Sequence, residues 1–150
     1  MSREAQGMGS QRAPEVSEEE IRQALMLGEQ LRAQITSLED QRAYLASLQA
    51  EYARGRAALE GLEQAKVGDE ILVPVGGGAH IRATVSDPDR VVSAVGANIH
   101  IEGSLAEAKA RVQERLQGVE GAIARVDGEL NRLMGELQRL QAGLSSLGLG

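Results

Sequence analysis

The last third of the chain carries the most restrictive pattern in the sequence. From Val112 to Leu147, apolar residues recur in alternating steps of four and three without a break. Alternation sustained over this length is typical of a coiled-coil seam, because it keeps one narrow apolar stripe on the same side of a helix. Ser104 and Glu107 precede the stripe in the spacing of a capping box. We therefore predict a helix over residues 104–147, with a seam of Val112, Leu116, Val119, Ile123, Val126, Leu130, Leu133, Leu137, Leu140, Leu144 and Leu147.

A second long helix is predicted over residues 17–66. It starts with another capping-box pattern, Ser17 followed by Glu20, and the next proline is Pro74. Its apolar residues recur every seven positions, at Ala24, Leu31, Leu38, Leu45, Tyr52 and Leu59. Their companions are Ile21 and Ile35 in the first half and Leu48 and Leu62 in the second. The companions lie three residues before the repeating position in the first half and three residues after it in the second half. Because this change falls near Arg42, we predict an interruption of the heptad repeat there.

Residues 67–103, between the two helices, have the alternation and turn signals of β-structure. Four short strands are predicted, at residues 70–75, 79–85, 90–95 and 98–102, with glycine-rich or proline-containing turns between them. In the second of these strands Ile81, Ala83 and Val85 share one face. Pro74 restricts the first strand to an edge or a bend. The segment therefore reads as two β-hairpins in series.

The composition indicates how these elements pack. The 150 residues are 42% hydrophobic but only 1% aromatic, so the apolar side chains are mainly Leu, Val, Ile and Ala. This favours thin helix contacts over a thick core. The predicted fold class is α+β, mostly α: one domain over residues 17–147, built as a long antiparallel coiled-coil hairpin with the two β-hairpins at its closed end. Residues 21–31 would then face residues 137–147, and Leu59 and Leu62 would meet residues 105–112. Residues 1–16 are predicted to be a flexible N-terminal tail and residues 148–150 a C-terminal tail.

Several classes of function are disfavoured. The chain has no cysteine and a net charge of −6, which argues against thiolate chemistry and against nucleic-acid binding. It has neither an apolar run of about 20 residues nor a secretory signal, so we expect a soluble cytoplasmic protein without a membrane partner. Gly76–Gly78 lacks the Gly-Lys-Ser/Thr of a phosphate loop. His80 and His100 have no companion ligands at metal-site spacing. We expect no enzymatic activity, no cofactor and no metal site.

Two surfaces of a single chain would remain uncovered. Isolated hairpins are marginally stable, and their open edges favour pairing with other strands. We therefore predict an obligate oligomer joined through the strands, with assembly residues Ile71, Val73, Val75, Ile81, Val85, Val91 and Val95.

The second uncovered surface is the end of the helical hairpin remote from the strands. Its apolar side chains exceed what a two-helix seam covers, which suggests a partner-binding tip. The alternative is simple fraying of the terminal turns. The predicted tip residues are Leu25, Met26, Leu27, Leu144, Leu147 and Leu149.

The strand segment carries a resemblance to a known family. Ile71–Gly78 reads Ile-Leu-Val-Pro-Val-Gly-Gly-Gly, a later Val95-Gly96-Ala97 turn precedes Ile99–Glu102, and Leu105-Ala-Glu-Ala follows. In this order the residues resemble the alpha-type subunits of prefoldin, and the likeness covers residues 17–147. Beta-type subunits have one hairpin, so two hairpins indicate the alpha type. Asn98 stands where the family often has Gly, and Asn tolerates the left-handed backbone conformation.

The resemblance implies an archaeal molecular chaperone. It would be a hexamer of two alpha and four prefoldin beta subunits, with the strands forming a barrel-like platform from which six coiled coils extend. Their tips would hold unfolded client proteins and pass them to a group II chaperonin without ATP hydrolysis. The alternative is a coiled-coil scaffold or tether subunit of another multiprotein complex, for which seam residues packed to the helix ends would be expected.

Overall fold

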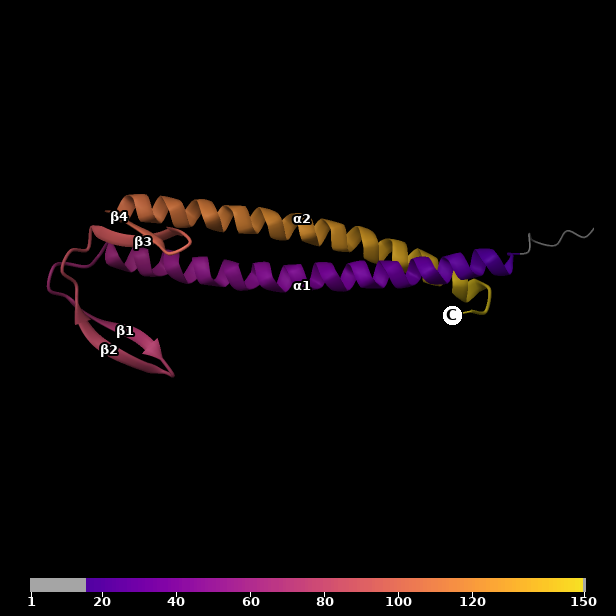
Figure 1. The fold of residues 1–150 in the computed structure, drawn as a ribbon, viewed down its shortest axis with the longest axis horizontal. Coiled ribbons are helices and arrows are strands. Elements are labelled where there is room, and N and C mark those ends of the chain that lie inside the picture. Colours follow the sequence, from indigo (N-terminus) through magenta and orange to yellow (C-terminus); the bar gives the residue numbers. More distant parts are fainter. Residues whose placement is uncertain (1–15, 150) are drawn as a thin grey trace, which may run out of the picture. The chain divides into compact units, whose positions relative to one another are not determined.

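The computed structural model describes residues 16–149. The elements follow in the order α1 (Glu18–Leu62), β1 (Glu70–Gly76), β2 (Ala79–Thr84), β3 (Arg90–Gly96), β4 (Ile99–Ser104) and α2 (Leu105–Ser146) (Figure 1). The prediction of two long helices with two β-hairpins between them is confirmed. Residues 1–15 of the predicted N-terminal tail, and Gly150 of the C-terminal tail, lie outside the described residues.

Both helices begin where the capping patterns place them. The Ser17 hydroxyl accepts a hydrogen bond from the Glu20 N–H at 3.1 Å, and the Ser104 hydroxyl accepts one from the Glu107 N–H at 3.1 Å. Each serine satisfies a backbone donor that has no partner within the helix. The helices start one residue after these serines, because a cap residue itself lies outside the helical conformation.

The first helix ends at Leu62, four residues before the predicted end. The N–H groups of Glu63, Gln64 and Ala65 each donate to the carbonyl three residues earlier, at 3.1–3.2 Å, so the chain tightens into a 3₁₀-like turn. The Lys66 N–H then donates to the Asp69 carboxylate at 2.8 Å. The periodicity did not reveal this end, because the local side-chain bond from Asp69 competes with continuation of the helix.

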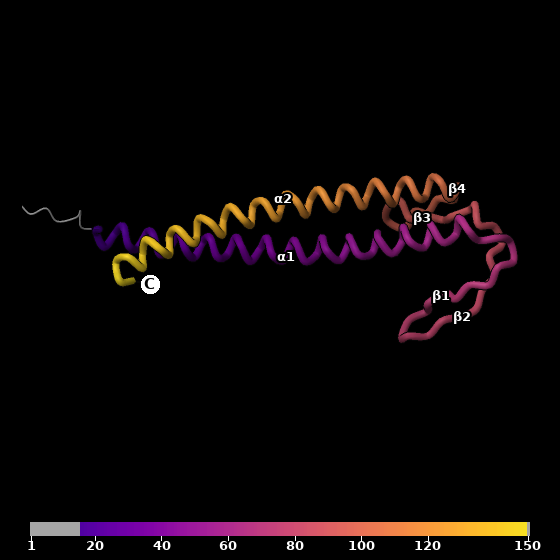
Figure 2. The backbone as a smooth tube through the Cα atoms, turned by 180° about the vertical axis from the view of Figure 1, so that it is seen from behind, coloured from indigo at the N-terminus to yellow at the C-terminus, as the bar shows by residue number. Residues whose placement is uncertain are grey.

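The described residues divide into two compact units, one made of residues 41–127 and the other of residues 16–40 and 128–149. In the unit of residues 41–127, the parts of α1 and α2 run side by side in opposite directions (Figures 1 and 2). Leu59, Leu105 and Ala108 form a buried cluster there. Against this cluster pack Leu62, Val91 and Val112. The predicted meeting of the end of the first helix with the start of the second is therefore confirmed.

The two hairpins are separate two-stranded antiparallel sheets. In the first, Glu70 pairs with Thr84, and in the second, Arg90 pairs with Ser104. Both sheets have a register shift shortly before the turn. Asn98 adopts a φ of 59°, so the expected tolerance of Asn for the left-handed conformation is confirmed.

In the other unit, described over residues 16–40 and 128–149, α1 and α2 again run in opposite directions (Figure 2). Leu31, Leu130 and Leu133 are buried. Gly28 lies so close to α2 that an added Cβ would be 3.4 Å from the Leu140 Cδ2 atom. The predicted facing of residues 21–31 with residues 137–147 is confirmed.

Candidate functional site

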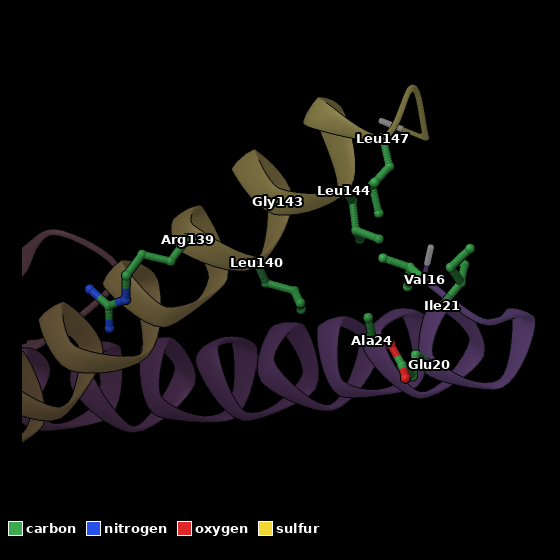
Figure 3. Close-up of a pocket in the computed structure, with 9 residues that line it drawn as sticks. All are labelled: Val16, Glu20, Ile21, Ala24, Arg139, Leu140, Gly143, Leu144 and Leu147. Atoms are coloured by element: carbon green, nitrogen blue, oxygen red, sulfur yellow. The ribbon is translucent and has the colours of Figure 1, made fainter. Parts of the chain in front are cut away.

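An open apolar groove of about 250 Å³ lies at the end of the helix pair in the unit of residues 16–40 and 128–149. Leu140, Leu144 and Leu147 of the α2 side are directed toward the first turns of α1 (Figure 3). Two charged side chains, Glu20 and Arg139, are among the residues that line the groove. The groove is lined by Val16, Glu20, Ile21, Ala24, Arg139, Leu140, Gly143, Leu144 and Leu147.

A second groove of about 300 Å³ lies beside the first, since Leu144 lines both. Its other lining residues combine two leucines with polar side chains, namely Leu25, Arg32, Gln141, Ser145 and Leu149. Leu144 itself is half-buried between the helices. The helix end therefore offers two adjacent grooves that share one leucine, the first mainly apolar and the second of mixed polarity.

The carboxyl end of α2 is shaped by a glycine cap. The helix ends at Ser146, one residue before the predicted end, and Gly148 has a φ of 78°. The Gly148 N–H donates to the Ser145 carbonyl and the Leu149 N–H to the Leu144 carbonyl, both at 2.9 Å. These are the two bonds of a Schellman motif, which turns the chain back over the last helical turn. Leu149 is thereby placed beside Leu144 in the second groove.

The six predicted tip residues all belong to this end of the helix pair. Five are between 44% and 54% exposed, and the sixth, Leu144, is half-buried. Sequence reasoning missed the groove residues Val16, Ile21, Ala24 and Leu140 as tip candidates. The heptad pattern could have identified Ile21, Ala24 and Leu140, because they are seam positions close to the helix ends. Where the two helices end, seam residues are no longer covered and line an open groove. The use of any of these residues in binding stays a prediction.

The predicted assembly residues fall into two groups. Ile71, Val75, Ile81 and Val95 are between 39% and 58% exposed, and Val73 is half-buried. Val85, by contrast, is only 8% exposed and lies just after β2, and Val91 packs against the Leu59 cluster. These two are already covered within the chain, so the first five are the ones that leave apolar surface for another subunit. Sequence reasoning missed the exposed strand residues Leu72, Val92, Ile99 and Ile101.

Several titratable side chains of residues 16–149 form ion pairs at the surface. His80 and His100 are exposed on β2 and β4, and no cluster of three metal-ligating side chains occurs in this range. The Arg132 guanidinium lowers the pKa of the Glu129 carboxyl, and Glu63 raises the pKa of the Lys109 ammonium. Both shifts favour the charged forms, whereas a general acid at neutral pH would need a raised carboxyl pKa. Over the same residues, neither helix has an apolar stretch of the length needed to cross a membrane.

Comparison with protein families gives one match. The family model described as "Prefoldin subunit" matches residues 31–148, which include most of both helices and all four strands.

Several curated relatives are prefoldin alpha subunits of archaea. The chain is 34% identical over 71 residues to that of Methanopyrus kandleri, covering 47% of this chain and 45% of the relative. It is 34% identical over 68 residues to that of Thermofilum pendens, covering 45% of this chain and 53% of the relative. The matched segments thus span about half the length of these relatives. The prefoldin subunit alpha 2 of Methanocaldococcus jannaschii is 32% identical over 100 residues, with 65% of this chain and 68% of the relative covered.

A solved structure has the same fold. It is a chain from the cryo-EM structure of filamentous PFD from Methanocaldococcus jannaschii, with a TM-score of 0.65 and 25% sequence identity. The superposition covers 81% of this chain and 98% of that one. Family model, curated relatives and fold agree, and the chain therefore belongs to the prefoldin family as an alpha-type subunit.

Proposed function

We propose that this chain is a subunit of a cytoplasmic chaperone that holds unfolded proteins at the apolar helix ends without ATP hydrolysis. Family membership supports the chaperone class. The observation that carries the proposal is the pair of grooves that share Leu144, with Leu25, Leu147 and Leu149 of their linings about half exposed. The first groove is mainly apolar and both grooves are open, which suits extended apolar segments of varied sequence better than one small molecule.

The binding at one tip is weak by physical necessity. Burying a whole Leu or Met side chain contributes about 1.5–3 kcal/mol, and these side chains have only half of their surface left to bury. Several tips in one assembly would act on the same client, so that weak contacts combine through a high effective concentration. Met26 suits such a surface, because its flexible thioether side chain adapts to different shapes.

The strands supply the assembly in this proposal. The exposed residues Ile71, Val75, Ile81 and Val95 would be buried when hairpins of different subunits join into one barrel-like sheet. Two copies of this chain would combine with four beta-type subunits, and the assembly would deliver its clients to a group II chaperonin. A scaffold subunit would instead have side chains packed to the helix ends, and the half-exposed leucines at the tip favour the chaperone.

The proposal is tested by making the tip polar. In the variant Leu25→Ser/Leu147→Ser/Leu149→Ser, three exposed apolar side chains that line the grooves are removed, while the buried seam residues Leu31, Leu130 and Leu133 are kept. Suppression of the aggregation of a chemically denatured test protein should need several-fold more subunit. Circular dichroism and native mass spectrometry, with a beta-type partner present, should show unchanged helices and unchanged assembly.

The matched control is Met134→Ser. Met134 is 45% exposed on α2 in the same unit, but it lines neither tip groove. It should leave suppression unchanged. Full suppression by the triple variant, or an equal loss with Met134→Ser, would contradict the proposed role of the tip.

A further inference from the structure

The two hairpins are structural repeats of one another with a spacing of 20 residues. The register of the first sheet, from Glu70↔Thr84 to Gly76↔Ala79, is reproduced position by position in the second, from Arg90↔Ser104 to Gly96↔Ile99. The register shift also falls at the equivalent place. The identical pairs in the sequence are Val75 and Val95, Gly76 and Gly96, His80 and His100, and Ile81 and Ile101.

Within this repeat, the charges at the open end of the hairpin are reversed. In the first hairpin Glu70 is on the first strand and Arg82 on the second, with Arg82 Nη1 2.6 Å from Glu70 Oε1. In the second hairpin Arg90 takes the place of Glu70, and Glu102 takes the place of Arg82, with Arg90 Nε 3.9 Å from Glu102 Oε1. All four side chains are more than half exposed, so they are available to a neighbouring strand.

The reversal has a definite consequence when another hairpin adds to a free edge. An antiparallel sheet that continues in the same up-and-down order places the second strand of one hairpin beside the first strand of the next. If two first hairpins join in this way and the register continues, Arg82 of one copy lies diagonally across from Glu70 of the second copy, as it does within its own hairpin. If two second hairpins join, Glu102 comes next to Arg90 in the same manner. Opposite charges meet at both junctions, which stabilises cross-strand pairs.

A junction between a first hairpin and a second hairpin would instead bring like charges together. A junction of β2 with β3 brings Arg82 beside Arg90, and a junction of β4 with β1 brings Glu102 beside Glu70. Like charges on neighbouring strands are destabilising, and they discriminate against the wrong partner more than they strengthen the right one. In agreement with this, β2 and β3 of one chain are joined by only five residues but belong to separate sheets.

We propose that the reversed charges direct assembly between copies of this chain, so that the first hairpin pairs with the first hairpin of a second copy and the second with the second. The inference rests on the strand-based assembly proposed above. In this inference the partner strand is selected by four charged residues, Glu70, Arg82, Arg90 and Glu102. The apolar strand residues supply the buried area.

The experiment uses single cysteines in the full chain, which has no cysteine of its own. Leu72 and Val92 are equivalent positions in the repeat, and both are 62% exposed. Leu72→Cys and Val92→Cys chains, one of them carrying a mass tag, are mixed and treated with a bismaleimide. Its span should be about 10 Å, which corresponds to two strand spacings. Cross-links between two Leu72→Cys chains, and between two Val92→Cys chains, should exceed the mixed cross-link by about threefold.

The decisive variant exchanges the charges of the first hairpin, Glu70→Arg/Arg82→Glu, in the Leu72→Cys chain. Its internal ion pair is retained, so the hairpin is expected to fold, but its charge order becomes that of the second hairpin. Cross-linking to Val92→Cys chains should then rise, and cross-linking to unexchanged Leu72→Cys chains should fall. The matched control exchanges an exposed ion pair on α1, Glu19→Arg/Arg22→Glu, and should change neither yield.

Two results would overturn the inference, and only one of them would also contradict strand-based assembly. Oligomers whose cross-linking pattern ignores the charge exchange would refute the charge-directed pairing and leave strand-based assembly intact. Chains that stay monomeric by native mass spectrometry would refute both the pairing and the strand-based assembly of this chain with itself.

Discussion

The Arg42 guanidinium binds the Asp127 carboxylate through two hydrogen bonds, from Nε to Oδ1 at 2.5 Å and from Nη2 to Oδ2 at 3.2 Å. This pair lies where the heptad repeat of α1 is interrupted, so an ion pair joins the two helices at a position that apolar residues occupy elsewhere. Planar two-bond pairing is geometrically specific. Arg42 and Asp127 therefore join α1 and α2 at one point within their unit.

A double-mutant cycle measures the coupling of this pair. Arg42→Ala, Asp127→Ala and the double variant should give a small favourable coupling at pH 7, because both side chains are more than 40% exposed. Urea unfolding followed by circular dichroism, at one fixed protein concentration, provides the free energies of unfolding. A coupling of zero would show that the pair does not stabilise the helix contact.

The same pair makes a pH dependence testable. Arg42 lowers the pKa of the Asp127 carboxyl, mainly through the hydrogen bonds between them. A carboxyl with a lowered pKa in the folded state stabilises the fold above its ordinary pKa of about 4, and this contribution is lost as the pH falls through the lower value. Asp127→Asn should therefore be less stable than the natural chain at pH 7, and the difference should shrink below about pH 4. A difference that stays constant down to pH 2 would exclude this linkage.

The Schellman motif at the end of α2 predicts a local effect of Gly148→Ala. Gly148 has a φ of 78°, which costs a residue with a Cβ about 1–2 kcal/mol. Amide hydrogen exchange at Leu147 and Leu149 should speed up about tenfold, with the middle of α2 unaffected. Gly143→Ala is the control: Gly143 is helical with no atom within 4 Å of an added Cβ, so exchange should stay equal or become slower. Equal exchange rates at Leu147 and Leu149 in both variants would mean that the Schellman motif does not stabilise the last turn of α2.

The turn of the second hairpin predicts a difference between two substitutions of Asn98. Asn98→Ala should destabilise the hairpin by about 1 kcal/mol, because Ala tolerates the φ of 59° less well than Asn, whereas Asn98→Gly should not. Amide exchange of the β3 and β4 backbone measures this stability without depending on the helices. Equal exchange in the two variants would show that the left-handed residue is not required for the turn.

Strand-based assembly predicts that a charge on the apolar face of the first hairpin prevents formation of the full assembly. Val73 is half-buried and pairs with Ile81, and Val73→Asp would place a carboxylate in the proposed contact. Native mass spectrometry should show smaller assemblies than those of the natural chain, while circular dichroism should show unchanged helix content. His80→Asp, on the opposite face of the same hairpin, should still assemble. Intact oligomers of the Val73→Asp chain would rule out that face as the contact.

Much of the fold could be predicted because its signals are local. The seam from Val112 to Leu147, the serine caps and the alternation of Ile81, Ala83 and Val85 each report on a few neighbouring residues. Of the missed features, the end of α1 is a local side-chain effect that periodicity does not report, and the others depend on contacts or on comparison of distant segments. The early end of α1 at Leu62 follows from the Lys66–Asp69 hydrogen bond, and the coverage of Val91 follows from its contact with the Leu59 cluster. The 20-residue repeat is visible in the sequence. The strand register is needed to show that the reversed charges occupy equivalent positions in the two hairpins.

The amino-acid sequence by itself determined the order of the elements and the apolar stripes, because periods of 3.5 and 2 residues are properties of single segments. It also determined which residues end up at the tip, since the lengths of the two helices make their ends meet. The tertiary structure alone decided which apolar side chains remain exposed. Burial depends on what lies opposite: Leu116 is covered by the facing helix, while Leu147, one of the same seam, is 48% exposed at its end. That difference turns a seam into a candidate binding surface.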